Sequence, residues 1–479
     1  EQMNLFKDMV CYQEEVRDPS RMAEVLNRVI EKAFRGSAPA QINVPRDYWT
    51  QVIDIDLPPI VRFERQGGGE EAVNKAASIL SKAKFPVILS GAGVVIGNAI
   101  EECKILAERL DAPVCNGYQH NDSFPGSHPL AVGPLGYNGS KAAMQLISKA
   151  DVVLALGTRL NPFSTLPGYG IDYWPKKATI IQVDMNPDRI GLTKKVTVGI
   201  CGDCKMVAKQ ISDKLSKDAG NDGREERKNL IHKTKSAWLQ TLTGLDHEED
   251  DPGTVWNKEA RERDKDRMSP RQAWRAIQEA IPTGAIISSD IGNNCAIGNA
   301  YPTFEEGRKY LAPGLFGPCG YGFPSILGAK IGCPDTPVIG FAGDGAFGIS
   351  MNEMSSCARK EWPAITMVIF RNYQWGAEKR NTTLWFDNNF VGTELDPELS
   401  YAKVADACGL KGVTVKTMEE TTAAIKQSCE DQKKGITTFV EIILNQELGE
   451  PFRRDAMKAP VKVAGINKKD MRPQKNLNT

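Results

Sequence analysis

Between residues 68 and 215 the chain alternates short, uniformly apolar segments with longer segments whose apolar positions recur at helical spacing. The short segments predict strands buried on both faces, and the longer ones predict the helices that cover them. The expected helices cover residues 70–83 and 99–110, and the expected strands cover residues 86–90, 113–115, 151–156 and 179–183. This order is typical of a doubly wound α/β domain with a parallel sheet.

A second alternating segment covers residues 268–450. Ser269-Pro270 predicts the start of a helix, because proline fits the first turn. The expected strands cover residues 285–288, 337–341, 365–370 and 437–444. We therefore predict an α/β fold with two doubly wound domains.

Residues 1–57 are too few and too simple to form a domain. They contain one amphipathic helix, 21–34, and one short strand, 41–44, which cannot build a core by themselves. We interpret this segment as the end of a domain. Since the first residue is Glu1 rather than Met, we expect the chain to be a piece of a longer protein.

Charge is dense but balanced. Residues 216–267 carry clusters of both signs and predict a linker with a solvated helix. Residues 451–479 are polar and lysine-rich, and we expect a tail that wraps a surface. Over the whole chain, 60 lysines and arginines face 60 aspartates and glutamates. A net charge of zero argues against nucleic-acid binding, which needs a positive field.

Composition excludes two further classes. A hydrophobic fraction of 41% excludes general disorder, and no stretch approaches the roughly 18 unbroken apolar residues of a membrane span. Eleven cysteines are scattered along the chain, which favours a reducing compartment and therefore the cytoplasm. The lone pair Cys201 and Cys204 has no partner motif for a metal site, so we interpret both as structural thiols.

The expected strand at 337–341 leads into Gly343-Asp344-Gly345-Ala346, where a helix should begin. Glycines at such a turn let backbone N–H groups approach a phosphate, and the helix N-terminus favours the phosphate charge. Asp344 offers a hard oxygen ligand at the same place. The turn therefore predicts a phosphate and metal site.

The next strand ends immediately before Arg371, Asn372 and Gln374. Adjacent parallel strands present their carboxyl ends together, so this end should lie beside the turn at Asp344. The side-chain oxygen of Asn372 and the backbone carbonyl of Gln374 would then join Asp344 in the near-octahedral shell that Mg²⁺ prefers.

This spacing, a Gly-Asp-Gly turn followed about two dozen residues later by an asparagine, resembles the signature of thiamine diphosphate (ThDP) enzymes. That family includes decarboxylases and acetolactate synthases. Its signature has two asparagines where this chain has Arg371 and Asn372, and the family's metal ligand is the second. The resemblance implies a pyrimidine-binding domain, a central Rossmann-like domain and a diphosphate-binding domain. We assign these to residues 1–57 as a remnant, 68–215 and 268–450.

Two other stretches resemble the same family. For the turn after the strand at 285–288, the resemblance implies that Gly292, Asn293 and Asn294 contact the diphosphate, together with the glycine turn described above. In the segment 316–324 the resemblance implies that the carbonyl of Gly317 meets the pyrimidine amino group. It also implies that Cys319 bends the cofactor, although cysteine is smaller than the family's usual residue. A glycine-rich packing contact is the alternative for this segment.

Segments 370–381 and 449–457 resemble a branch of the family that acts on sulfoacetaldehyde. The resemblance implies conversion of sulfoacetaldehyde and phosphate to acetyl phosphate and sulfite, in the degradation of sulfonates such as taurine. Arg371, Lys379 and Arg380 could bind a sulfonate or phosphate, because arginine suits such anions. A solvated basic loop is the alternative.

The resemblance also implies a shared active site. In the family a glutamate of the pyrimidine domain activates the cofactor, and no residue here matches it, Glu14 and Glu15 included. We therefore assign no catalytic side chain. Because the family's active sites lie between two subunits, a homodimer or homotetramer is implied.

Three other functions stay open. The chain could be an acetolactate synthase-like carboligase or decarboxylase that acts on 2-oxo acids, or a noncatalytic ThDP-binding module. The third function is a nucleotide-binding oxidoreductase, because the turn from Gly91 to Gly97 follows a strand and precedes a helix, as in dinucleotide sites. No acidic residue stands at the end of a second strand about 20 residues on, so we favour a structural turn.

Overall fold

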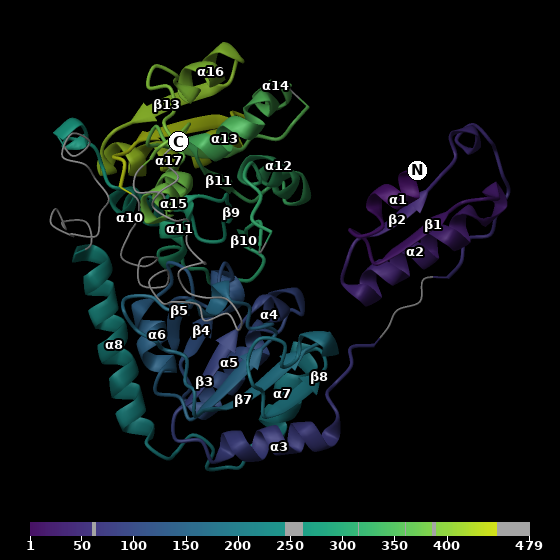
Figure 1. Cartoon of the computed structure of the whole chain (residues 1–479), viewed down its shortest axis with the longest axis vertical. Coiled ribbons are helices and arrows are strands. Elements are labelled where there is room, and N and C mark those ends of the chain that lie inside the picture. Colours follow the sequence, from purple (N-terminus) through teal and green to yellow (C-terminus); the bar gives the residue numbers. More distant parts are fainter. Residues whose placement is uncertain (60–63, 245–261, 315, 360, 386–388, 448–479) are drawn as a thin grey trace, which may run out of the picture. The chain divides into compact units, whose positions relative to one another are not determined.

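The computed structural model describes the chain except for residues 60–63, 245–261, 315, 360, 386–388 and 448–479. The chain divides into two compact units, residues 1–64 and 65–479, and each is described by itself (Figure 1). The polar tail expected at 451–479 lies outside the described residues.

The first unit is a small β–α–β arrangement. Strand β1 (Tyr12–Glu15) pairs in parallel with β2 (Ala40–Asn43), and α2 (Met22–Gly36) packs against both. Its buried apolar side chains are Val16, Val25 and Val29. The helix and strand expected here are confirmed. A short helix, α1 (Gln2–Phe6), precedes them.

The first sheet of the second unit is fully parallel, with strand order β5-β4-β3-β6-β7-β8. Its strands are β3 (Pro86–Ser90), β4 (Val114–Asn116), β5 (Ala131–Pro134), β6 (Val152–Leu156), β7 (Thr179–Asp184) and β8 (Val198–Cys201). Helices α3 (Glu70–Ser81), α5 (Ile100–Leu110) and α7 (Cys204–Lys214) pack together, and α6 (Lys141–Ile147) packs with α8 (Arg224–Gly244). The order reverses between β3 and β6, as the doubly wound prediction requires.

The second sheet has the order β10-β9-β11-β12-β14-β13, again fully parallel. Its strands are β9 (Ile286–Ser289), β10 (Tyr310–Leu311), β11 (Val338–Gly343), β12 (Thr366–Arg371), β13 (Lys411–Val415) and β14 (Thr438–Ile443). The accompanying helices include α10 (Pro270–Ala280), α11 (Asn293–Ile297), α12 (Gly322–Gly332), α13 (Asp344–Ser350), α15 (Gly376–Trp385), α16 (Tyr401–Ala407) and α17 (Met418–Lys433). Strands β9, β11 and β12 are neighbours in this sheet. The turns that follow their carboxyl ends therefore lie at the same edge of the sheet.

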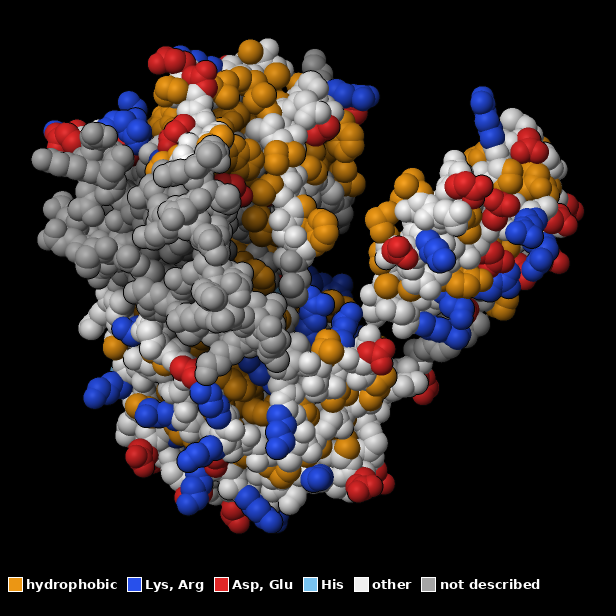
Figure 2. Space-filling view, viewed as in Figure 1, with side chains coloured by type: hydrophobic (Ala, Val, Ile, Leu, Met, Phe, Trp, Pro, Cys, Tyr) orange, Lys and Arg blue, Asp and Glu red, His pale blue; other side chains and the backbone are white. Residues whose placement is uncertain are grey.

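Helix α8 corrects one expectation about the charged segment 216–267. Ile231 and Trp238 are buried on this helix, and Arg227 is only 1% exposed. A solvated helix is therefore the wrong description of this face. Elsewhere on residues 65–479, Lys and Arg side chains are interspersed with Asp and Glu on the visible face (Figure 2). In the part of the chain that the structure describes, no helix combines the length and apolar character needed to cross a membrane.

Candidate functional site

The predicted site residues meet at the carboxyl ends of three neighbouring strands. In the sheet register Ser289 of β9 pairs with Phe341 of β11, and Gly343 of β11 pairs with Phe370 of β12. The turns that follow these strands therefore lie side by side. This confirms the convergence that the parallel-strand rule predicts.

Asp344 stands at the centre of the three turns and is 1% exposed. Its Oδ2 accepts hydrogen bonds from Arg371 Nη1 at 3.0 Å and from the backbone N–H of Tyr373 at 2.6 Å. Its Oδ1 accepts the backbone N–H of Gly345 at 3.0 Å. Burial raises the pKa of Asp344 to about 6, and the cation of Arg371 opposes that rise. A nearby cation therefore stabilises the ionised form of this buried carboxylate.

Asn372 and Gln374, the other predicted metal ligands, follow β12 and are both buried. The Gln374 side chain donates to the carbonyl of Gln446 at 3.1 Å, whereas its Oε1 is buried with no partner among the described residues. That bond anchors the loop whose backbone would face the metal. The donors are a carboxylate, an amide and a carbonyl, the oxygen set that suits Mg²⁺.

The turn after β9 carries unsatisfied amide groups. Asn293 is 5% and Asn294 4% exposed, yet both amide atoms of Asn293 and Oδ1 of Asn294 lack partners among the described residues. Buried amides normally have partners, so these point to a polar ligand. Gly292 has a φ of +134°, which favours glycine. The environment fits the diphosphate of ThDP.

Gly345 and Ala346 follow Asp344 in the first turn of helix α13, and both are buried. A Cβ built at Gly345 would lie 2.9 Å from the ring of Trp375. At Gly343, by contrast, a Cβ would meet only Nδ2 of Asn294, at 3.9 Å. Gly345 is therefore required for packing, and Gly343 leaves space toward the turn after β9.

Asp290 is a buried residue of this site that the sequence analysis did not single out. Its carboxylate accepts the backbone N–H groups of Ile291 at 2.7 Å, Gly320 at 3.1 Å and Gly322 at 2.7 Å. It thus ties the turn after β9 to the glycine segment 316–322. Burial raises its pKa, and the backbone donors oppose that rise. The sequence did contain a signal for Asp290, because a carboxylate at the end of an expected strand and next to a glycine turn is a candidate site residue.

In that glycine segment, Gly317 has a φ of +63° and Cys319 is half-buried. Gly320, at φ +87°, packs against Ile349 of α13. The segment therefore lies beside the predicted metal turn. The roles assigned to the Gly317 carbonyl and the Cys319 side chain stay predictions.

Asp290→Ala is expected to weaken ThDP binding about tenfold, because both loops lose their common anchor. The measurement is calorimetric titration of ThDP at saturating Mg²⁺. Glu279→Ala, on an exposed position of α10, is the matched control and should leave the affinity unchanged. Unchanged affinity in a folded Asp290→Ala protein would show that the loops hold their positions without it.

The three predicted anion-binding residues contact protein groups. Arg371 is 1% exposed and pairs with Asp344. Lys379 pairs with Glu394 and donates to Gln446 at 3.3 Å. Arg380, also 1% exposed, donates to the Tyr137 hydroxyl at 3.2 Å. A solvated basic loop is therefore wrong for the two arginines, and anion binding stays a prediction.

The turn at Gly91 supports its structural interpretation. A Cβ at Gly91 would lie 2.6 Å from the carbonyl oxygen of Gly157, and one at Gly93 would lie 2.6 Å from the Gly157 Cα. These glycines let β3 and the turn after β6 pack closely.

Cys201 and Cys204 are free thiols. Among the described residues, no group of three or more His, Cys, Asp or Glu side chains is placed to hold a metal.

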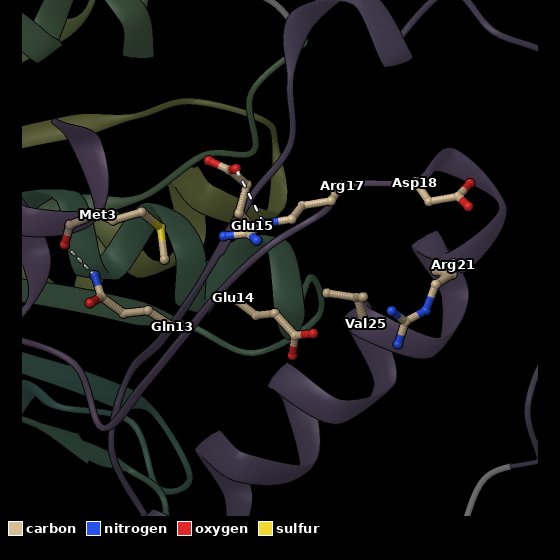
Figure 3. A pocket seen from close by; sticks show the side chains of 8 residues that line it. All are labelled: Met3, Gln13, Glu14, Glu15, Arg17, Asp18, Arg21 and Val25. Carbon is tan, nitrogen blue, oxygen red and sulfur yellow. Dashed lines mark hydrogen bonds and ion pairs between the residues drawn. The ribbon is translucent and has the colours of Figure 1, made fainter.

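In the first unit, Glu14 and Glu15 border a pocket (Figure 3). Glu14 binds Arg28 at 2.8 Å and accepts the Tyr12 hydroxyl at 2.7 Å. These bonds, that of Arg28 foremost, lower the pKa of Glu14 to about 2. Glu15 lies 3.9 Å from Arg17. A carboxylate held ionised by arginine is poorly suited to protonate a cofactor.

Comparison with known proteins identifies the family. Residues 73–211 match the model "Thiamine pyrophosphate enzyme, central domain", and residues 290–442 match "Thiamine pyrophosphate enzyme, C-terminal TPP binding domain". The chain is 77% identical over 477 residues to a probable sulfoacetaldehyde acetyltransferase of Rhizobium meliloti (strain 1021), covering 100% of this chain and 81% of the relative. The chain belongs to the sulfoacetaldehyde acetyltransferase family. Members of this family are acyltransferases, which confirms the predicted enzyme class.

A second relative and a solved structure agree. The sulfoacetaldehyde acetyltransferase of Roseovarius nubinhibens (strain ATCC BAA-591 / DSM 15170 / ISM) is 74% identical over 474 residues, covering 99% of this chain and 79% of the relative. The fold resembles benzoylformate decarboxylase from Polynucleobacter necessarius, with a TM-score of 0.71 at 20% identity, over 93% of this chain and 78% of that one. The predicted ThDP-enzyme architecture is thereby confirmed.

Proposed function

We propose that the protein uses ThDP and Mg²⁺ to convert sulfoacetaldehyde and phosphate to acetyl phosphate and sulfite. The observation that carries this proposal is the 77% identity to a probable sulfoacetaldehyde acetyltransferase across the whole chain. At this identity the residues that select a substrate are expected to be shared. Degradation of sulfonates such as taurine is the corresponding role.

The metal ligands of the proposal are the Asp344 carboxylate, the Asn372 side-chain oxygen and the Gln374 carbonyl. Diphosphate oxygens and water would complete a near-octahedral shell. The unsatisfied amides of Asn293 and Asn294 would receive the diphosphate. When bound, ThDP supplies the carbon nucleophile that attacks the aldehyde, and the protein positions and shields it.

The remaining parts of the proposal concern assembly and location. We assign proton activation of the cofactor to no residue of this chain, and we propose active sites shared within a homodimer or homotetramer. We place the reaction in the cytoplasm, because all eleven cysteines are free thiols.

The deciding experiment uses the full-length gene product. Purified protein is mixed with ThDP, Mg²⁺, phosphate and sulfoacetaldehyde, and sulfite and acetyl phosphate are followed together. The expected result is release of both products in equal amounts, dependent on phosphate. Pyruvate replaces sulfoacetaldehyde as the matched control substrate, with acetolactate as its readout.

Two outcomes would contradict the proposal. Acetolactate from pyruvate without sulfite release would retain the cofactor site but overturn the substrate. Bound ThDP with no turnover of either substrate would indicate a noncatalytic binding module.

A further inference from the structure

Arg371 occupies the position where the family signature has its first asparagine, and its guanidinium is fixed by contacts on every nitrogen. Its Nη1 donates to Asp344, its Nη2 donates to the carbonyl oxygens of Asp396 and Leu399, and its Nε lies 3.8 Å from Glu441 Oε1. The side chains of Arg371, Asp344 and Glu441 are each no more than 1% exposed. The guanidinium is thus held in one orientation.

Tyr373 and Arg267 extend this arrangement. The guanidinium carbon of Arg371 lies 4.3 Å from the Tyr373 ring centroid, and that of Arg267 lies 4.8 Å from it. Cations near an aromatic ring are attracted by its quadrupole. Tyr373 has a φ of +61°, an uncommon value for a tyrosine, and this conformation directs its N–H to Asp344. Tyr373 therefore acts on Asp344 in two ways: its ring holds Arg371, which donates to the carboxylate, and its own backbone N–H donates to the carboxylate directly.

The consequence for Asp344 follows from counting lone pairs. A carboxylate offers about two acceptor positions per oxygen. Both positions on Oδ2 are taken, by Arg371 Nη1 and by the Tyr373 N–H, whereas Oδ1 accepts only the Gly345 N–H among the hydrogen bonds of the described residues. One oxygen remains able to bind a cation, so Asp344 is restricted to monodentate binding.

We propose that Arg371, held by Tyr373 and Arg267, makes the metal site selective for Mg²⁺ over Ca²⁺ by blocking bidentate binding through Asp344. Mg²⁺ requires near-ideal octahedral geometry with short bonds, whereas Ca²⁺ takes more oxygens and accepts bidentate carboxylates. This inference rests on the proposed function, because it assumes that Asp344 binds the cofactor's metal. Arg371 acts through Asp344 and is a positioning residue.

The test is a titration of Mg²⁺ and of Ca²⁺ at a fixed, saturating concentration of ThDP, followed by tryptophan fluorescence. Trp375 lies against Gly345 and reports on the loop directly. Arg371→Asn is expected to shift the ratio of the two dissociation constants toward Ca²⁺ by about tenfold, since Oδ2 regains an acceptor position. A residue with a merely structural role would weaken both cations alike.

Tyr373→Asn provides a second variant, because asparagine tolerates a positive φ but lacks the ring. It should shift the ratio in the same direction by about threefold, and Tyr373→Phe, which keeps the ring, should not shift it. Arg359→Asn removes an exposed arginine of the same domain and is the control for Arg371→Asn. If Arg371→Asn does not fold, the Tyr373 pair decides.

The outcomes separate the two proposals. An unchanged Ca²⁺ to Mg²⁺ ratio in the folded variants, with tight Mg²⁺ binding in the wild type, overturns this inference alone. Failure of the wild type to bind Mg²⁺ in the presence of ThDP overturns the proposed function, and this inference with it.

Discussion

Asp344→Ala is expected to abolish Mg²⁺-dependent binding of ThDP, weakening it by at least about a hundredfold. The substitution removes the carboxylate among the three predicted metal ligands. It also leaves the guanidinium of Arg371, 1% exposed, without the partner at 3.0 Å. The buried cation would then have Glu441, 3.8 Å away, as its remaining ionic partner among the described residues, and loss of the closer one should loosen the turn itself. Calorimetric titration of ThDP at several Mg²⁺ concentrations measures the effect.

Two further variants separate charge from packing. Asp344→Asn keeps the size of the side chain and removes its charge, and it should lose most of the Mg²⁺ dependence. Asp335→Ala changes an exposed aspartate that precedes β11, at the end of the strand opposite the site, and should bind ThDP like the wild type. ThDP affinity unchanged in folded Asp344→Ala would remove this residue from the metal site.

The location of this site could be predicted because its determinants are local. The strand, glycine turn and helix at 338–350 follow one another along the chain, and the parallel-strand rule places Asn372 beside them. The partner of Arg371 could not be predicted in this way. A basic residue next to a loop suggests that it binds a ligand anion. In the structure Arg371 instead meets two acids beside its own strand β12: Asp344 follows the neighbouring strand β11, and Glu441 lies on the other neighbour, β14. Which acid an arginine meets depends on register, and composition does not specify register.

The missed strands have a related cause. β1 is polar, Tyr-Gln-Glu-Glu, and its four residues are all half-buried, so it carries no apolar run to detect. β8 alternates buried and exposed residues, as a strand at the edge of its sheet does. The central strands β6 and β12, buried throughout, were predicted to within a residue at each end. Periodicity therefore detects strands that are buried on both faces more readily than edge strands, of which β2 was predicted but β1 and β8 were not.

Arg227→Met is expected to lower the free energy of unfolding of the central domain by about 3–5 kcal/mol. Arg227 belongs to the charged segment that was predicted to be a linker, yet its guanidinium donates to five backbone carbonyls. Nε meets Asp111, Nη1 meets Lys84 and Asp222, and Nη2 meets Leu110 and Gly220, at 2.5 to 3.0 Å.

The size of this effect follows from what those carbonyls do. Leu110 ends helix α5, and the last carbonyls of a helix have no partner within it. Arg227 donates to the carbonyls of Leu110 and Asp111 at this helix end, as well as to three loop carbonyls, through its fixed fork of N–H donors. Methionine has no such donor, and lysine has a single ammonium in its place. Each carbonyl left buried without a donor costs about 1–3 kcal/mol, partly offset where water enters.

Urea unfolding followed by circular dichroism measures the change as a lower midpoint. Lys233→Met removes an exposed cation from the same helix and should shift the midpoint little, because surface substitutions away from such contacts are close to neutral. If both variants unfolded at the wild-type midpoint, water would have to satisfy all five carbonyls at no cost. That result would overturn the stabilising role assigned to Arg227.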